Sequence, residues 1–283
     1  MDNSVVFSGI APHPPLLVPE VGGDRLKEVA DSQRSLTEFS RRLVNAKPDT
    51  VVVISPHSPI DPVRFTTRSA KVLIGDFHEF RAPRVRLEFQ NDLELVKAVG
   101  AAAELEGVEL AELRGDPPLD HGALVPLYYV REAGWNGPVV VFGFTQQSND
   151  AHLAFGLAIA RGSASIKRRI ALVASGDLSH RLIVGGPYEY EPTAHLFDEQ
   201  IVNAIAGCNP RAVLDVDLDL RIRAGECGYR SVVVALGCVD QELHDCKVLS
   251  YEGPFGVGYM VAILVDEARA SGVDERPESP TDG

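Results

Sequence analysis

Cysteine is scarce in this chain, and its spacing excludes two common kinds of cysteine-based site. The 283 residues contain four cysteines, all in the last third: Cys208, Cys227, Cys238 and Cys246. No two of them have the CxxC spacing that is typical of zinc sites and redox motifs. Residues 1–15 carry no basic segment, and serine and prolines interrupt their apolar run, so we do not expect a secretory signal there. We therefore expect four reduced thiols in a cytoplasmic protein.

Lysine is also scarce, and basic residues nowhere form a block. Lysine and arginine together number 27 against 40 aspartates and glutamates, which gives a formal net charge of −13. Nucleic acids and anionic membrane surfaces attract proteins with a positive surface, so neither is an expected partner. The longest apolar runs have the length of strands and are too short to span a bilayer.

Three familiar catalytic and nucleotide-binding motifs are missing. No G-x-G-x-x-G follows the first predicted strand, and no G-x-x-x-x-G-K is followed by Ser or Thr. The usual cradles for nicotinamide dinucleotides and nucleoside triphosphates are therefore absent. The G-x-S-x-G turn of serine hydrolases does not occur either.

Apolar runs of strand length alternate with helical patterns along the chain, within a composition that is 45% hydrophobic and 24% charged. Strands are predicted at residues 5–11, 50–55, 138–144 and 169–175, with shorter pieces at 71–75 and 84–89 and two late strands at 247–251 and 257–265. Helices are predicted over 24–45, 91–106, 121–133, 193–206, 217–224 and 228–238, and another begins at Asn149 or Asp150. Near-continuous apolar runs such as TVVVIS are typical of strands that are buried on both faces.

This alternation predicts an α/β fold with a single domain, in which a mostly parallel central sheet is flanked by helices on both faces. No linker or change of composition interrupts the chain before residue 265, so residues 1–265 are predicted to form that domain. Residues 266–283 are charged and rich in proline and serine, and we expect a disordered acidic tail there.

Three histidines follow three different buried strands. His13 follows the strand at 5–11, His57 follows the strand at 50–55, and His180 follows the strand at 169–175. In open α/β sheets, ligands bind beyond the carboxyl ends of the strands, so these side chains are expected to share one site. His121 lies in LDHGALVPL, at the start of a predicted helix. Neutral imidazole is the commonest ligand of transition metals, and the sequence therefore predicts a metal site.

A metal site with open positions for substrate and dioxygen also needs a carboxylate. Two histidines and one carboxylate on one face are typical of non-haem iron(II). The best candidate is Glu226 in RAGECGYRS, which lies in a glycine-flanked break between two helical patterns. The residues alone leave alternatives open, because Glu226 could instead be an exposed partner of a nearby arginine, and other ligands compete with it. The arginine would be Arg223 or Arg230. The competing ligands are Cys227, Asp177 and Asp120.

Six segments together resemble a known family. They are GIAPHPPLLVPEVGG, VVVISPHSP, LDHGALVPLYY, SGDLSH, AGECGYRSVV and SYEGPFGVGYMVA. Their order and spacing resemble the class III extradiol ring-cleavage dioxygenases, in the family of the beta chain of protocatechuate 4,5-dioxygenase. The likeness is greatest to the branch that forms the amino-terminal part of the AmmeMemoRadiSam system protein A, and the MEMO proteins are more distant relatives.

The resemblance implies a role for each candidate residue. It implies that His13, His57 and Glu226 bind Fe(II), with zinc or another divalent metal as the alternative in a purified sample. It places His180 as the catalytic base and His121 as a second active-site histidine near the substrate. The implied reaction opens the ring of a catechol-like or 2-aminophenol-like aromatic with O2. The family also implies a homo-oligomer, alone or with a small partner subunit.

Two other functions compete with this interpretation. One is a metal-binding, redox or interaction protein without ring-cleavage activity, as the likeness to MEMO proteins and the position of Cys227 would allow. The other is a zinc hydrolase that uses the same pocket and a metal-bound water as nucleophile. The arginine-rich segment 59–86 is expected to form either a wall of the pocket or a solvated connection.

Overall fold

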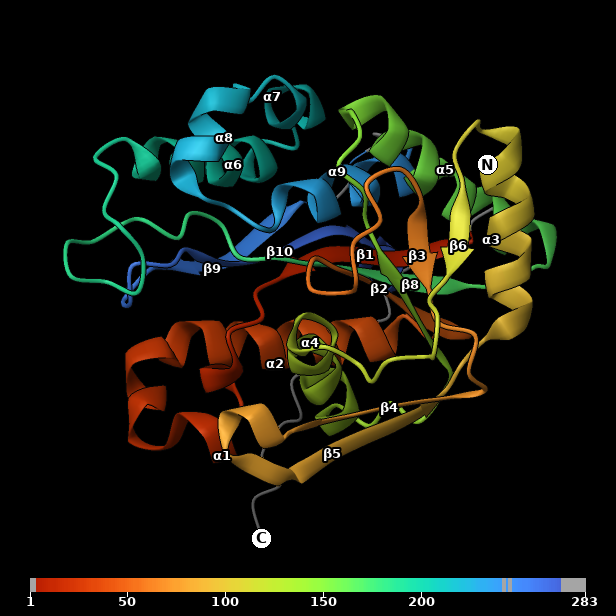
Figure 1. The fold of residues 1–283 in the computed structure, drawn as a ribbon, viewed down its shortest axis with the longest axis horizontal. Helices are drawn as coiled ribbons and strands as arrows, with labels where there is room; N and C mark the ends of the chain where they lie inside the picture. The colour runs from red at the N-terminus through yellow and green to blue at the C-terminus, as the bar shows by residue number, and fades with distance from the viewer. Residues whose placement is uncertain (1–3, 241–242, 244–245, 271–283) are drawn as a thin grey trace, which may run out of the picture.

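An eight-stranded sheet lies at the centre of the computed structural model, which describes residues 4–240, 243 and 246–270. Its strands are β1 (Val5–Ala11), β2 (Thr50–Ser55), β3 (Phe65–Thr67), β6 (Leu110–Glu112), β7 (Val139–Gly143), β8 (Ile170–Ser175), β9 (Lys247–Glu252) and β10 (Tyr259–Asp266). Their order across the sheet is β6-β3-β7-β2-β8-β1-β10-β9 (Figure 1).

The four central strands are parallel. Strand β2 pairs in parallel with β7 on one side and β8 on the other, and β8 pairs in parallel with β1. Antiparallel pairing occurs toward the edges, where β10 joins β1 and β9, and β3 joins β7. The predicted mostly parallel sheet is confirmed, and the carboxyl ends of β2, β8 and β1 lie next to one another.

Helices cover both faces of the sheet, as predicted (Figure 1). On one face lie α2 (Ala30–Asn45), α4 (His121–Glu132) and a separate hairpin of β4 (Val72–Phe77) and β5 (Ala82–Gln90). On the other face lie α3 (Leu93–Leu105), α5 (Asn149–Ser165), α6 (Ala194–Ala206) and α9 (Tyr229–Cys238). Short helical segments connect these elements: η1 (Pro15–Leu17), α1 (Pro19–Gly22), η2 (Gly23–Val29), η3 (His78–Phe80), α7 (Pro210–Leu214), α8 (Leu218–Ala224) and α10 (Glu267–Ala270).

Strand β2 shows why the sequence folds in this way. Its six residues are all buried, and its side chains alternate between the two faces. Val51 and Val53 pack into the core beneath α2 and α4, whereas Val52 and Ile54 pack into the core on the opposite face. Such a strand needs cover on both sides, because leaving either face in water would expose a row of branched apolar side chains.

Two of the four cysteines correct the expectation that all thiols are reduced. Cys208 and Cys246 form a disulfide in the structure, with their Cα atoms 5.5 Å apart, and Cys227 and Cys238 are free. The two paired residues are 38 positions apart in the sequence, so spacing alone gives no signal of the pair. Within the described residues, no helix is both long and apolar enough to cross a membrane.

The carboxy-terminal end of the sheet extends beyond the boundary expected for the domain. Strand β10 reaches Asp266, which is buried, and the short helix α10 follows it. The predicted tail therefore begins within regular secondary structure. Its remaining residues, 271–283, lie outside the described part of the chain.

Candidate metal centre

Three histidines from different elements meet at the carboxyl edge of the sheet. His13 lies two residues beyond β1, His57 lies two residues beyond β2, and His121 is the first residue of α4. One ring nitrogen of each lies within 4.8 Å of a ring nitrogen of the others. The Nε2 atoms of His13 and His57 are 3.0 Å apart. The structure thus joins the two histidines expected to bind metal with one of the two expected to be catalytic.

The orientation of His13 leaves its Nε2 atom ready to bind a cation. The Ser175 hydroxyl, at the end of β8, donates its proton to the carbonyl oxygen of Gly122. It must therefore accept, rather than donate, in its 2.9 Å hydrogen bond with Nδ1 of His13. His13 consequently carries its proton on Nδ1, and the lone pair of Nε2 faces the other two imidazoles.

All three imidazoles are held in the neutral form that binds metals. Burial, followed by repulsion from neighbouring histidines, holds the pKa of His13 well below its usual value. Partial desolvation of its ring lowers the pKa of His57, although the residue is exposed on one side, and burial lowers the pKa of His121 to about 4. His13 is buried, whereas His57 is exposed and His121 is half-buried, so the cluster can be reached from solution.

His180 lies beside this cluster but outside the group of converging ring nitrogens. Its backbone N–H donates to the carbonyl of Ala224, and its ring stacks on Tyr188 with centroids 5.0 Å apart. The preceding residue is also fixed, because the backbone N–H of Ser179 donates to the buried carboxyl of Asp198 at 2.8 Å. Burial, with repulsion from the nearby His57, lowers the pKa of His180 to about 4. The imidazole of His180 is therefore neutral at pH 7.

The Glu226 carboxylate is turned to other partners in this structure. Its Oε1 atom accepts hydrogen bonds from the guanidinium of Arg221, at 3.1 and 3.2 Å. Its Oε2 atom accepts from the backbone N–H of Tyr229 at 2.7 Å, at the start of α9. Among the described residues, the groups of converging ligand atoms do not include Glu226. The side chain of Glu226 is buried and its partner is Arg221, so the alternative of an exposed pair with Arg223 or Arg230 is wrong. Its role as a metal ligand stays a prediction.

Two competing ligands considered from the sequence do lie beside His13. The Cys227 Sγ atom is 3.6 Å from Nε2 of His13, and an oxygen of the buried Asp177 is 3.9 Å from the same nitrogen. Burial raises the pKa of the Cys227 thiol and raises the pKa of Asp177 to about 7. The two loops that carry them touch through glycines, since a Cβ on Gly176 would come within 2.1 Å of the Cα of Gly228.

The β4–β5 hairpin forms one wall of the site. Phe80, in the turn between the two strands, lies edge-on to the ring of His121 with centroids 5.4 Å apart. This part of the arginine-rich segment is therefore a wall, which was one of its two expected roles. The contact also gives the site an aromatic surface next to an imidazole.

Three residues that shape the site were not predicted from the sequence. Ser175 orients His13, Tyr188 stacks on His180, and Asp198 holds the loop that carries His180. Ser175 gave a usable signal, because it is the polar end of an apolar strand. Tyr188 and Asp198 gave none, since one lies in an irregular loop and the other looks like an ordinary polar residue of a helix.

The donor set fits a divalent transition-metal ion. Three neutral imidazoles with converging nitrogens are ligands that suit zinc, copper, iron and nickel. The buried carboxyl and thiol next to His13 add further donors on the same side. Fixed orientation of one ligand, through Ser175, is a usual property of metal sites.

Comparisons with known proteins agree with this architecture. A protein of Escherichia coli, JW3007, whose structure is described as that of an uncharacterized protein, aligns with a TM-score of 0.55 and 16% identity. The alignment covers 92% of this chain and 99% of that protein, and at this identity it shows the fold alone.

Sequence comparisons extend the likeness beyond the fold. Protein CA_C1420 of Clostridium acetobutylicum is 32% identical over 263 residues, which are 90% of this chain but only 56% of that protein. The chain thus spans about half the length of this relative. Residues 9–262 match the model of the family described as the catalytic LigB subunit of aromatic ring-opening dioxygenase. The chain therefore belongs to the LigB family of aromatic ring-opening dioxygenase catalytic subunits.

Proposed function

We propose that the protein is a divalent-metal-dependent, extradiol-type dioxygenase that opens the ring of a catechol-like or 2-aminophenol-like aromatic with O2. The observation that carries this proposal is the meeting of His13, His57 and His121, next to His180, in a chain of this family. A purely structural metal site would have no need of a fourth, neutral histidine beside the ligands.

The metal would be held by His13 and His57, on which sequence and geometry agree. For the third ligand, the resemblance implies Glu226, whereas the geometry offers His121. Binding by Glu226 would require its carboxylate to leave the guanidinium of Arg221. Bound Fe(II) would supply a centre that binds both a substrate oxygen and O2 and passes electron density between them.

His180 would act as the general base of the reaction. Its imidazole is neutral, and it lies close enough to His57 that a positive charge on His57 would lower the pKa of His180. A neutral imidazole can take the proton of a substrate hydroxyl, which makes the substrate a better electron donor. Tyr188, stacked on one face of His180, would hold the imidazole ring in place, and Phe80 would contact the aromatic ring of the substrate.

The test is oxygen uptake by protein that has been purified without oxygen and reconstituted with Fe(II). A panel of catechols and 2-aminophenols is supplied, and the metal content of the same sample is measured. We expect uptake that forms a ring-opened product, with turnover falling by about 10²- to 10⁴-fold in His180→Ala, the usual contribution of a general base. That variant should keep its metal. Full metal content without uptake on any substrate would contradict the proposal.

A second function is favoured by the position of Cys227. A thiol 3.6 Å from Nε2 of His13 is a soft ligand within reach of the same cation. We propose, as the alternative, a metal-binding or redox protein without ring-cleavage activity. In that case Cys227→Ser would change the affinity and the choice of metal, and His180→Ala would change neither.

A further inference from the structure

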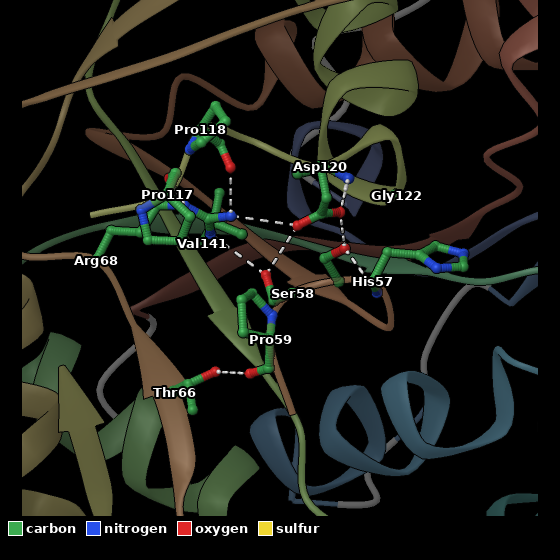
Figure 2. A network of polar contacts seen from close by, with 12 residues as sticks. His57, Ser58, Pro59, Thr66, Arg68, Pro117, Pro118, Asp120, Gly122 and Val141 are labelled. Carbon is green, nitrogen blue, oxygen red and sulfur yellow. Dashed lines mark hydrogen bonds and ion pairs between the residues drawn. The ribbon is translucent and has the colours of Figure 1, made fainter. Parts of the chain in front are cut away.

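A buried arginine belongs to the network of polar contacts that reaches His57 (Figure 2). Arg68, just beyond β3, is only 2% exposed, and its guanidinium makes four polar contacts. Its Nε and Nη2 atoms donate to the carbonyl oxygens of Pro117 and Pro118, each at 2.9 Å. Its Nη1 atom donates to the Ser58 hydroxyl at 3.2 Å, and Nη2 lies 3.3 Å from a carboxylate oxygen of Asp120. Arg68 therefore joins the loop after β2 to the segment that leads into α4.

Asp120 carries these contacts on to the metal site. One of its oxygens accepts from the backbone N–H of Ala123 and so caps α4, and the same oxygen accepts the hydroxyl proton of Ser55. The other oxygen accepts from Ser58 at 2.9 Å as well as from Arg68. Both oxygens are thus fully used, and the carboxylate has no spare capacity to bind a metal itself.

The first turn of α4 is connected to all three imidazoles. It contains His121, and it reaches His57 and His13 through the serines that hydrogen-bond to them. The Ser55 hydroxyl, held by Asp120, accepts from the backbone N–H of His57. The carbonyl oxygen of Gly122 accepts from Ser175, which in turn orients His13.

Gly122 keeps this turn close to the imidazole of His57. A Cβ at Gly122 would lie 2.5 Å from the Ser55 hydroxyl oxygen and 3.2 Å from the His57 ring. A Cβ so close to the hydroxyl would force a shift, so the approach requires glycine. A movement of the first turn of α4 would therefore change the spacing of all three imidazoles.

We propose that Arg68 is a positioning residue for the metal site, which acts through Asp120 to fix the first turn of α4 and with it the spacing of the three imidazoles. This inference rests on the proposed metal site and adds to it a residue that touches neither metal nor substrate. Outer partners of metal ligands typically contribute about 10- to 100-fold in metal affinity. Arg68 is expected to contribute in that range, although it contacts no imidazole directly.

The chain contains a matched control at the opposite end of β2. There Asp92 caps α3, accepts the hydroxyl proton of Thr50 at 2.6 Å, and forms an ion pair with Arg168 at 3.0 Å. Asp92 and Asp120 are both largely buried helix caps that hold a strand hydroxyl and an arginine. Only the Asp120 cluster faces the imidazoles, so the control separates an effect on the metal from a general effect on folding.

The experiment measures the affinity for Zn²⁺ or Co²⁺ alone by titration calorimetry, together with the visible absorption of bound Co²⁺. The site variants are Arg68→Met and Asp120→Asn, and the controls are Arg168→Met and Asp92→Asn. Asparagine remains a good helix cap, so the two aspartate variants should fold even if a methionine variant does not. We expect affinity to fall by about 10- to 100-fold, with an altered Co²⁺ spectrum, in the site variants alone. Arg68→Lys should recover part of the affinity, since it restores the charge but not the planar fork.

Each outcome has a distinct meaning. Unchanged affinity and spectrum in Arg68→Met and Asp120→Asn, with tight binding by the unmodified chain, would overturn the positioning role alone. An equal loss in the control variants would also overturn it, because the effect would then come from general destabilisation. Failure of the unmodified chain to bind either ion would overturn the proposed metal site and this inference with it.

Discussion

The two ends of strand β2 are built from the same parts, but they have different neighbours. At the start of the strand, Thr50 donates to the helix cap Asp92, which also meets an arginine. At its end, Ser55 donates to the helix cap Asp120, which meets Arg68. Both clusters fasten a helix to the sheet. Only the cluster at Ser55 adjoins the imidazoles of the metal site, because it lies at the carboxyl edge, where the loops of a parallel sheet meet.

A buried helix cap with an ion pair therefore does not by itself indicate a functional site. What distinguishes the Ser55 end is the group next to it, His57, whose backbone N–H the same hydroxyl accepts. At the Thr50 end, the arginine of the cluster, Arg168, also pairs with the exposed Glu94. The positioning role proposed for the Ser55 end and the fastening of α3 at the Thr50 end can therefore be separated by experiment.

The largest effect is expected from removal of a ligand at the carboxyl end. His57→Ala should lose metal more completely than any variant of the supporting residues, because it deletes one of the converging nitrogens. Thr50→Val, at the other end of the strand, should keep full metal content. The measurement is metal per chain after reconstitution with Fe(II) or Zn²⁺, and retention of one ion per chain in His57→Ala would contradict the proposed site.

The same assay identifies the third ligand. If Glu226 binds the ion, Glu226→Gln should lose metal while His121→Ala keeps it. If His121 is the ligand, His121→Ala should lose metal while Glu226→Gln keeps it. Glu226→Gln can still accept the hydrogen bond from the backbone of Tyr229, so it tests the charge and leaves the start of α9 in place.

A smaller effect is expected from the two hydroxyls. Ser55→Ala and Thr50→Val each remove one hydrogen bond to a carboxylate, so each should lower the free energy of unfolding by about 1.5–3 kcal/mol. Urea unfolding with and without saturating Zn²⁺ then separates the ends. The deficit of Thr50→Val should be the same in both conditions, whereas that of Ser55→Ala should grow with metal because its bound state is weakened. A constant deficit in both variants would remove the distinction between the two ends.

A change of pH is expected to alter the stability of the metal-free chain, which tests the two imidazoles without a metal. The pKa of His121 and that of His180 are each lowered to about 4, against about 6.5 in the unfolded chain. Between these values the unfolded state binds more protons, so stability should fall as pH drops from about 6.5 toward 4. The slope, measured by urea unfolding, should become shallower in His121→Gln and stay unchanged in Thr50→Val. An unchanged slope in His121→Gln would show that this histidine is not held neutral by burial.

The sequence predicted the buried strands closely and the two three-residue strands not at all. The bounds of β1 and β2 agree with the prediction, because continuous apolar runs leave few alternatives for a buried segment. Strands β3 and β6 have three residues each, too few to show any periodicity. The helix predicted over 91–106 begins at Leu93, because Asp92 caps it, and asparagine at residue 91 is an equally good residue type for a cap.

The site was predictable only as far as strand ends locate side chains. His13 and His57 could be placed together because parallel strands end at one edge of the sheet. The partners of Glu226 could not, since its contact with Arg221 depends on how α8 packs before α9 begins. Nor could Arg68, whose importance comes from carbonyl oxygens of a distant proline pair and not from any local motif.

The contact between Gly176 and Gly228 determines whether the conformational entropy of the site is lost during folding or during metal binding. Because neither position has room for a side chain, the loop after β8 and the loop before α9 are locked together by their backbones. The conformational entropy of these loops is therefore lost as the chain folds, and little remains to be lost when an ion arrives. A preorganised site of this kind is expected to load metal without a slow rearrangement, and a larger residue at Gly176 is expected to force the two loops apart.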